Sequence, residues 1–176
     1  MTQHFGENRT CVTSGNGRKQ VSTVVEGAAC PSGQTPLYRS RGLRGHTGID
    51  LAAAAGQPVY AAHAGRVWEL ETELDRGIGV GIISGRSYDF PSGRFHAKTR
   101  YWHLTAYAVK EGDRVRTGQL IGWAGSTGLA SGPHLHFELK PVVRVARGSY
   151  RNADPENGYR GAIDPAGYVE RFEPTA

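Results

Sequence analysis

The stretch "SGPHLHFELK", residues 131–140, places two histidines one residue apart within a short apolar run. In a β-strand, side chains at positions i and i+2 lie on the same face, with their backbones about 6–7 Å apart. His134 and His136 then point to one side, while Leu135 and Phe137 point to the other side, into a core. The pattern predicts a strand that presents two imidazoles to one cleft.

A second stretch, "GHTGIDLA" at residues 45–52, supplies His46 and Asp50. Positions i and i+4 share a face on a strand or on one helical turn. Neutral imidazoles and carboxylates are normal zinc ligands, and a catalytic zinc has three protein ligands and keeps one position for water. His46, Asp50 and one histidine of residues 134–136 therefore predict a metal site. The alternative is two strands with solvent-facing histidines.

The composition favours a β-rich domain. The chain has 25 glycines among 176 residues, and long helix-forming runs are scarce. Short strand-like runs separated by glycine and proline follow from residue 46 onward, and residues 88–97, "YDFPSGRFHA", are expected to form a hairpin loop. We predict antiparallel sheets or a sandwich-like barrel.

The length of 176 residues is enough for one compact domain with a core. No apolar run approaches the roughly 20 residues that span a bilayer, so no transmembrane segment is expected. The first residues, "MTQHFGENRTC", are polar and lack the apolar region of a secretory signal. We therefore expect a mature or truncated domain, or a chain exported by other means, such as a virus particle or cell lysis.

The net charge of +5 and the isoelectric point of about 9.4 indicate either a basic surface that aids solubility or an anionic partner. No arginine-rich run and no RNA-binding aromatic motif is present, so nucleic acid is not the expected partner. A bacterial cell wall that carries acidic polymers is the other class of anionic partner.

Longer motifs carry a resemblance to a known family. "GHTGIDLAAAAGQPVYAAHAGRV", "YWHLTAYAVKEGDRVRTGQLIGWAGSTGLASGPHLHFEL" and "IDPAGYV" resemble the lysostaphin-type (LytM-like) zinc endopeptidases of peptidoglycan, and the opening "TQHFGEN" is similar to the usual start of that family. The resemblance covers roughly residues 45–68, 101–139 and 163–169. It implies a mainly β fold in which antiparallel sheets with long loops form a groove. It also implies zinc-dependent hydrolysis of peptide cross-links or bridges in bacterial peptidoglycan.

The same resemblance implies a role for five residues. His46, Asp50 and His136 would bind zinc, while His103 and His134 would be catalytic histidines that do not bind the metal. An unligated histidine can take a proton from water and return it to the leaving amine, and a second can stabilise the oxyanion of the tetrahedral intermediate. We expect His134 to be the general base and His103 the stabiliser, with the reverse or a shared role as the alternative.

The resemblance also suggests how the chain is organised. We expect a single peptidase domain over residues 1–176, with an N-terminal segment (1–40), a catalytic core (41–140) and a C-terminal extension (141–176) that closes the fold. Insertions around residues 8–40, 84–100 and 144–162 depart from the family pattern, so we expect them to set specificity or to attach the domain to something.

The two cysteines, Cys11 and Cys30, do not form a zinc-finger pattern. A disulfide between them would stabilise the fold by roughly 3 kcal/mol through loop closure. We favour the disulfide because an oxidising compartment suits a cell-wall enzyme, and two unpaired thiols are the alternative.

The remaining polar residues of interest have structural interpretations. His63 is expected to be a partly exposed strand or turn residue, and His96 a loop residue. Glu138 shares the face of the two strand histidines by i, i+2 counting, so a hydrogen bond that orients a metal ligand is an option. Ser126 and Thr127 are expected to serve a glycine-rich turn.

Two other functions compete with the endopeptidase. A binding or regulatory module that keeps the fold without activity usually loses metal ligands, whereas all five positions are filled here. A biotinyl or lipoyl carrier domain has a hairpin similar to residues 109–125, but neither Lys110 nor Lys140 sits in the exposed turn that such a domain modifies. The expected partner is the peptidoglycan peptide, at a periplasmic, extracellular or virion-associated site. The sequence leaves open which cross-link is cut, the delivery route and the oligomeric state.

Overall fold

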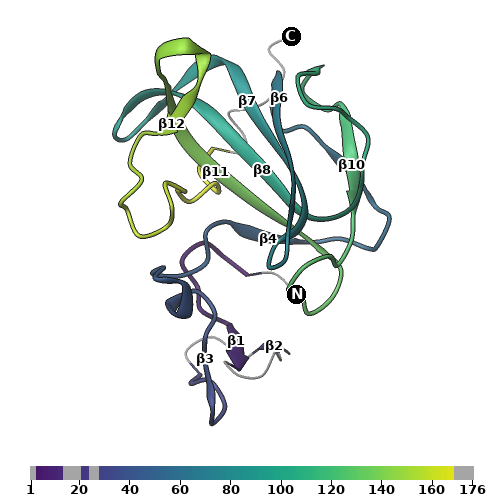
Figure 1. Ribbon diagram of the computed structural model, residues 1–176, viewed down its shortest axis with the longest axis vertical. Coiled ribbons are helices and arrows are strands. Elements are labelled where there is room, and N and C mark those ends of the chain that lie inside the picture. Colours follow the sequence, from purple (N-terminus) through teal and green to yellow (C-terminus); the bar gives the residue numbers. More distant parts are fainter. Residues whose placement is uncertain (1–2, 14–20, 24–27, 169–176) are drawn as a thin grey trace.

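The structure is a computed structural model that describes residues 3–13, 21–23 and 28–168. It consists of a large and a small antiparallel sheet, and the small one lies below the large one in Figure 1. Within the described part of the chain, no helix is long and apolar enough to cross a membrane. Residues 1–2, 14–20, 24–27 and 169–176, which include parts of the expected insertion 8–40 and the end of the expected extension 141–176, lie outside the described residues.

The large sheet has the strand order β12-β11-β8-β7-β6-β9, and β4 pairs with β11, β10 with β8, and β5 with β10. Every pairing is antiparallel, and the sheet is open and not closed into a barrel. The prediction of a mainly β fold with antiparallel sheets is therefore confirmed. The strands are β4 (Ile49–Ala52), β5 (Pro58–Tyr60), β6 (Gly65–Glu73), β7 (Gly77–Phe90), β8 (Gly93–Tyr107), β9 (Arg114–Val115), β10 (Leu120–Ala124), β11 (His134–Arg144) and β12 (Tyr150–Asn152).

The longest hairpin of the sheet corrects one expectation. The structure extends β7 to Phe90 and starts β8 at Gly93, so only two residues form the turn of the expected loop 88–97. Tyr88 pairs with Phe95 across the hairpin, and aromatic residues of this kind favour strands over loops. His96 is consequently a strand residue, and its Nδ1 lies 3.0 Å from the Ser84 carbonyl.

The main core lies between the large sheet and the β5–β10 pair, which Figure 1 shows beside it. Strand alternation sends Phe137 of β11 into this core, where it is 4% exposed, and Leu135 packs against the same cluster. The prediction that these two residues anchor the histidine strand is confirmed. The fully buried members include Val67, Val80, Ile82, Leu104 and Ile121.

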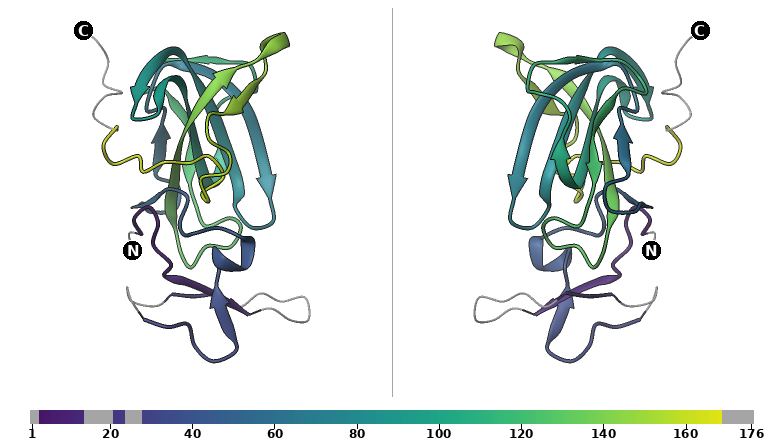
Figure 2. Two further views of the ribbon diagram at one scale, coloured as in Figure 1. Left: turned by 90° about the vertical axis from the view of Figure 1, so that its left-hand side faces the viewer. Right: turned by 90° about the vertical axis from the view of Figure 1, so that its right-hand side faces the viewer.

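The small sheet has the order β2-β1-β3, with β1 at Thr10–Thr13, β2 at Val21–Thr23 and β3 at Gln34–Pro36. A disulfide joins Cys11 of β1 to Cys30, so the predicted pairing of the two cysteines is confirmed. The 3-10 turn η1 (Arg39–Arg41) follows β3. Figures 1 and 2 show this N-terminal unit below the end of the large sheet that carries β4.

The expected C-terminal insertion contains little regular structure. Residues 144–162 include the 3-10 turn η2 (Ala146–Gly148) and β12, which returns along the end of β11 with Tyr150 opposite Arg144. The segment therefore adds one short strand to the edge of the large sheet.

Candidate metal centre

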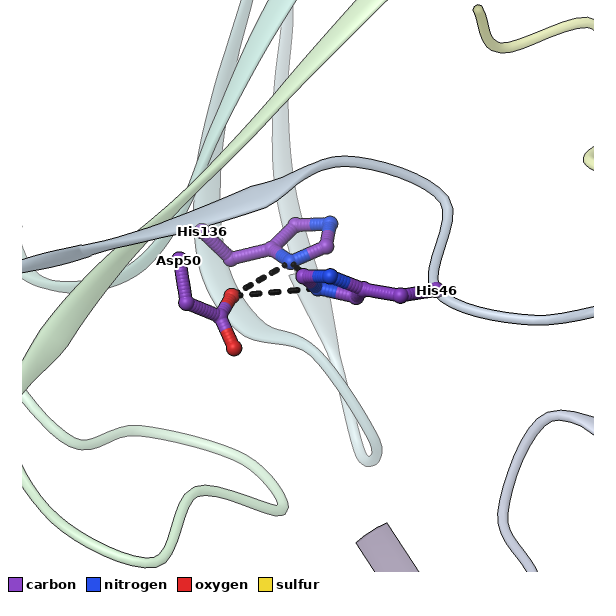
Figure 3. A group of neighbouring side chains, drawn as sticks. All are labelled: His46, Asp50 and His136. Carbon is purple, nitrogen blue, oxygen red and sulfur yellow. Dashed lines mark hydrogen bonds and ion pairs between the residues drawn. The ribbon is translucent and has the colours of Figure 1, made fainter. Parts of the chain in front are cut away.

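The fold brings together three residues that are far apart in the sequence. In the antiparallel pair of β4 and β11, Asp50 lies directly opposite His136. His46 comes from the loop before β4 and turns back toward both (Figure 3). The His46 Nε2 and Asp50 Oδ1 atoms are 3.1 Å apart, and His136 Nδ1 lies 2.7 Å from His46 Nε2 and 3.0 Å from Asp50 Oδ1. One atom from each side chain therefore points at a common position.

The three side chains fit a zinc ion by donor type and by spacing. Two imidazole nitrogens and one carboxylate oxygen are a common donor set for zinc, and neighbouring ligands of a tetrahedral zinc ion lie roughly 3.4 Å apart. The three atoms are already within 3.1 Å of one another, so small outward shifts suffice to reach that spacing. The group leaves further coordination positions to be filled from the cleft side.

The electrostatics of the group favour a bound cation. Burial alone raises the pKa of the Asp50 carboxyl, but hydrogen bonds from His136 and His46 outweigh burial and hold that pKa well below its usual range. Burial lowers the pKa of His46, and the neighbouring His136 lowers it further. A carboxylate and a neutral imidazole are the protonation states that bind a metal.

The ring nitrogens that point away from this group also have partners. His46 donates its Nδ1–H to the carbonyl oxygen of His4 over 3.0 Å, and the backbones of residues 3–7 and 46–50 are joined by hydrogen bonds. His136 Nε2 lies 3.4 Å from Oε1 of Glu138, which also accepts a hydrogen bond from Thr47 Oγ1 over 2.5 Å. These contacts fix the orientation of both imidazole rings.

Glu138 is fully buried, so its charge needs compensation. Its carboxylate lies 3.3 Å from Lys140 Nζ, 3.5 Å from Arg100 Nη1 and 3.9 Å from Arg76 Nη1. Burial raises the pKa of Glu138, but the charge of Lys140 and the hydrogen bond with His136 outweigh it and hold the pKa well below the usual value. Glu138 is therefore an anion beside His136. From the sequence, this contact was only one option.

His103 and His134 lie next to the three-residue group. Their ring centroids are 4.6 Å apart, and the His103 ring is 6.0 Å from the His136 ring. His103 has φ = 63°, a left-handed conformation that non-glycine residues adopt rarely and that is concentrated at functional sites. Its Nδ1–H donates to the Thr127 carbonyl over 2.7 Å, and His134 Nδ1 lies 2.9 Å from the Gly132 carbonyl. All five histidine and aspartate positions expected from the sequence therefore meet in one place.

A cleft with a volume of about 340 Å³ opens onto this place. The loop 129–133 forms one wall, and Leu37 and Tyr38 of the N-terminal unit form another. Asp50, His103 and the two histidines of β11 also line the cleft. The expected groove is therefore present, and the insertion around residues 8–40 contributes to it.

His63 corrects another expectation, because it is 1% exposed and not partly exposed. The chain bends inward between β5 and β6, and the ring donates Nδ1–H to the Ala64 carbonyl while the Thr99 hydroxyl lies 3.0 Å from Nε2. Burial lowers the pKa of His63 to about 4. His63 lies outside the group of three and is a buried structural histidine.

The family of the chain follows from comparison with known proteins. Residues 44–153 match the description "Peptidase family M23". The chain belongs to this family. The resemblance inferred from the sequence motifs is thus confirmed, and the cofactor of M23 peptidases, zinc, fits the donor set at His46, Asp50 and His136.

Curated relatives of this M23 chain include two named endopeptidases. The glycyl-glycine endopeptidase ALE-1 of Staphylococcus capitis is 37% identical over 94 residues, which cover 53% of this chain and 24% of that protein. The peptidoglycan DD-endopeptidase ShyA of Vibrio cholerae is 38% identical over 128 residues, which cover 73% of this chain and 25% of that protein. The chain thus matches about a quarter of the length of these relatives.

Among solved structures, the catalytic domain of lysostaphin from Staphylococcus simulans superimposes with a TM-score of 0.56 at 30% identity. The superposition covers 72% of this chain and 80% of the lysostaphin domain. The lysostaphin-type fold that the motifs imply is therefore confirmed.

Proposed function

We propose that this chain is a zinc-dependent endopeptidase that hydrolyses peptide cross-links or bridges of bacterial peptidoglycan. The observation that carries the proposal is the convergence of His46 Nε2, Asp50 Oδ1 and His136 Nδ1 at a cleft that also presents His103 and His134. The name of ShyA, a peptidoglycan DD-endopeptidase, supports peptidoglycan peptides as the substrate class, and the name of ALE-1, a glycyl-glycine endopeptidase, supports peptide-bond hydrolysis. The proposed unit is one peptidase domain, with an N-terminal segment (1–40) that contributes Leu37 and Tyr38 to the cleft, a catalytic core (41–140) and a C-terminal extension (141–176) that closes the fold.

In this proposal His46, Asp50 and His136 hold zinc. The metal supplies a Lewis acid and lowers the pKa of a water molecule that it coordinates. The His4 carbonyl and the Glu138 carboxylate, which contact the outer nitrogens of the two ligand histidines, hold the rings in the tautomers that leave His46 Nε2 and His136 Nδ1 free to bind.

The surroundings of His103 suit a proton acceptor. Its Nδ1–H is engaged by the Thr127 carbonyl, so the neutral ring keeps its lone pair on Nε2. Burial, followed by the charges of His136 and His134, lowers the pKa of His103 to about 3, so the ring is neutral at physiological pH. These features support His103 as the base, which is the reverse of the assignment preferred from the sequence.

The surroundings of His134 suit a hydrogen-bond donor. Its Nδ1 lies 2.9 Å from the Gly132 carbonyl, and its Nε2 lies 3.6 Å from the Asp50 carboxylate, on the side of the metal centre. A ring N–H of His134 on that side can donate a hydrogen bond to the oxyanion that develops on the substrate carbonyl.

The reaction then proceeds through two proton transfers at His103. The water oxygen attacks the carbonyl carbon of the scissile peptide bond while His103 Nε2 accepts the proton that water releases. His103 then donates that proton to the amide nitrogen, the C–N bond breaks, and a carboxylic acid and an amine form; the acid proton passes to the amine, so that the products leave as a carboxylate and an ammonium group. His134 stabilises the oxyanion in both steps.

The name of ShyA, a peptidoglycan DD-endopeptidase, supports a site of action outside the cytoplasmic membrane, and the disulfide suits that setting. We infer a periplasmic or extracellular site of action, with a virus particle as one delivery route.

The test is incubation of the purified protein with two kinds of peptidoglycan, one with glycyl bridges and one with direct D-alanyl–diaminopimelate cross-links. We expect new amino groups to be released from at least one of them, activity to stop on chelation, and zinc to restore it. Mass spectrometry of the products identifies the bond that is cut. Activity that survives complete removal of metal, or the absence of new amino groups from both walls, contradicts the proposal.

A further inference from the structure

A second cleft, with a volume of about 830 Å³, is lined by residues of β12 and of the start of β6. Figure 1 shows β12 at the end of the large sheet opposite β4. It shares no lining residue with the cleft at the metal centre. We call it the arginine cleft, after the charged side chains that line it. These are Arg66, Arg86, Arg114, Arg116 and Arg144.

The charge of the arginine cleft is of one sign. Its lining contains five arginines and no aspartate, glutamate, lysine or histidine. The net charge of the entire sequence is also +5, so the positive and negative charges outside the cleft are equal in number. None of the five arginines forms an ion pair with an acidic residue in the described part of the chain. The cleft is therefore a concentrated cationic site without internal compensation.

The strand register places two of these arginines next to each other. Arg66 of β6 lies directly opposite Arg114 of β9, and Arg116 follows two residues later. Like charges in opposing positions of an antiparallel pair are destabilising. The two charges therefore do not add to the stability of the fold. An anion bound between the two guanidinium groups would relieve the repulsion and accept charge-assisted hydrogen bonds.

Aromatic rings lie among the arginines. Trp68 is 37% exposed, and its ring meets the edge of Tyr150 at a centroid distance of 5.2 Å. The Arg86 guanidinium stacks 4.8 Å above the Tyr88 ring. The cleft therefore offers apolar faces as well as cations, which suits an anionic chain whose charged groups alternate with carbon segments.

We propose that the arginine cleft binds a phosphodiester-linked polyol polymer of the bacterial cell wall, and thereby holds the chain on the wall. Cross-strand neighbours are about 5 Å apart, and strand positions i and i+2 are about 7 Å apart. The spacing of the arginines therefore matches that of the charges on a polymer with one phosphate in each short repeat unit. The proposal takes the wall as the setting and in that respect rests on the proposed function.

The position of the cleft explains how such binding would assist hydrolysis. Strand β11 runs from His136 at the metal centre to Arg144 in the arginine cleft, which is about 26 Å along the strand. A wall polymer held at one end of β11 leaves the other end free to reach peptides of the same wall. Binding at both ends raises the effective concentration of the substrate without a new contact at the metal centre.

The test compares binding of labelled poly(glycerol phosphate) to the full chain and to two double variants. The first variant is Arg66→Glu/Arg114→Glu. The matched control, Arg94→Glu/Arg151→Glu, makes the same charge change outside the cleft, at one exposed ion pair and on the exposed side of β12. Single-stranded DNA of equal charge is the second probe, and cleavage of a soluble cross-linked peptide is measured in parallel.

We expect the cleft variant to bind poly(glycerol phosphate) at least about tenfold more weakly, with a smaller salt dependence, while the control binds like the wild type. Cleavage of the soluble peptide stays unchanged in both variants. Equal weakening in the control, equally tight binding of DNA, or no binding of the polymer by the wild type overturns the proposal. Failure of the proposed function is distinguishable, because it removes peptide cleavage in the wild type and leaves polymer binding measurable.

Discussion

His103 donates its ring Nδ1–H to the backbone carbonyl of Thr127 over 2.7 Å. The side chain of Thr127 is in turn hydrogen-bonded to two neighbouring strands. Its hydroxyl accepts a hydrogen bond from the Ile78 amide over 3.0 Å and donates one to the Leu104 carbonyl over 2.8 Å. The Thr127 side chain thus ties the turn after β10 to β7 and β8, and this turn orients the ring of His103. We infer that Thr127 is a positioning residue for His103.

Replacing Thr127 by alanine removes both side-chain hydrogen bonds and leaves the carbonyl less well placed. We expect Thr127→Ala to lower kcat by about tenfold, with zinc content and KM little changed. Thr127→Ser keeps the hydroxyl and should retain most activity, as should Ser126→Ala in the same turn. Equal losses in Thr127→Ala and Ser126→Ala would mean that the turn as a whole, and not this hydroxyl, matters.

Glu138→Gln removes the negative charge beside His136 Nε2 and keeps the shape of the side chain. Because a carboxylate that contacts the outer nitrogen of a ligand histidine raises its basicity, we expect zinc affinity to fall by about 10–100-fold. Competition with a chromogenic chelator measures this affinity. Glu71→Gln is the matched control, since Glu71 pairs with Arg100 of the same charged group without contacting His136. A similar loss of zinc affinity in both variants would mean that the whole cluster of charged residues around Arg100, and not the contact between Glu138 and His136, controls zinc binding.

The disulfide stabilises the N-terminal unit that supplies Leu37 and Tyr38 to the cleft wall. We expect Cys11→Ser/Cys30→Ser to lower the free energy of unfolding by about 3 kcal/mol, because the loop between the two residues is no longer closed. Because the disulfide no longer holds this wall of the cleft in place, KM for peptidoglycan should rise by a larger factor than kcat falls. Denaturant titration and steady-state kinetics check the two parts, and reduction of the wild type should reproduce them. An unchanged KM would contradict the role of this unit as a cleft wall.

His63 makes stability depend on pH. Above pH 6.5 the ring is neutral in the folded and the unfolded chain, so its contribution is fully present there. Between pH 6.5 and about 4 the unfolded chain binds a proton that the folded chain does not. The free energy of unfolding should therefore fall by up to about 3 kcal/mol as the pH drops through this window, with no further change from His63 below it.

The His63 prediction is checked by denaturant unfolding of the wild type and of His63→Gln at several pH values, together with NMR titration of the ring. The difference between the two proteins isolates His63 from the histidines of the metal centre. A His63 pKa near 6.5, or the same pH dependence in the variant, would show that the ring is accessible to protons in the folded chain.

Much of the site could be predicted because its signals are local. The alternation around His134 and His136 requires a strand, and the apolar residues between them fix which face the imidazoles take. The ligand set could be inferred because zinc accepts few residue types, so His46 and Asp50 stand out beside that strand. The family motifs then placed His103 in the same group, and the structure brings all five side chains together.

Other features of the structure could not be predicted, because they do not depend on the types of residue in the sequence. The carbonyl groups of His4 and Thr127, which orient two of the imidazoles, belong to the backbone, which every residue has. The burial of His63 depends on how the chain bends between β5 and β6, and the length of the β7–β8 hairpin depends on pairing between distant residues. The opposition of Arg66 and Arg114 likewise follows from strand register, which single-strand patterns do not determine.

We propose that His46, Asp50 and His136 bind zinc while the neighbouring His103 and His134 remain unligated. The most direct measurement is the zinc content and the peptidoglycan-hydrolysing activity of His136→Ala and His134→Ala, which differ only in which histidine of β11 is lost. We predict that His136→Ala loses both zinc and activity, whereas His134→Ala retains about one zinc per chain and loses activity. Loss of zinc in His134→Ala with retention in His136→Ala would contradict the account.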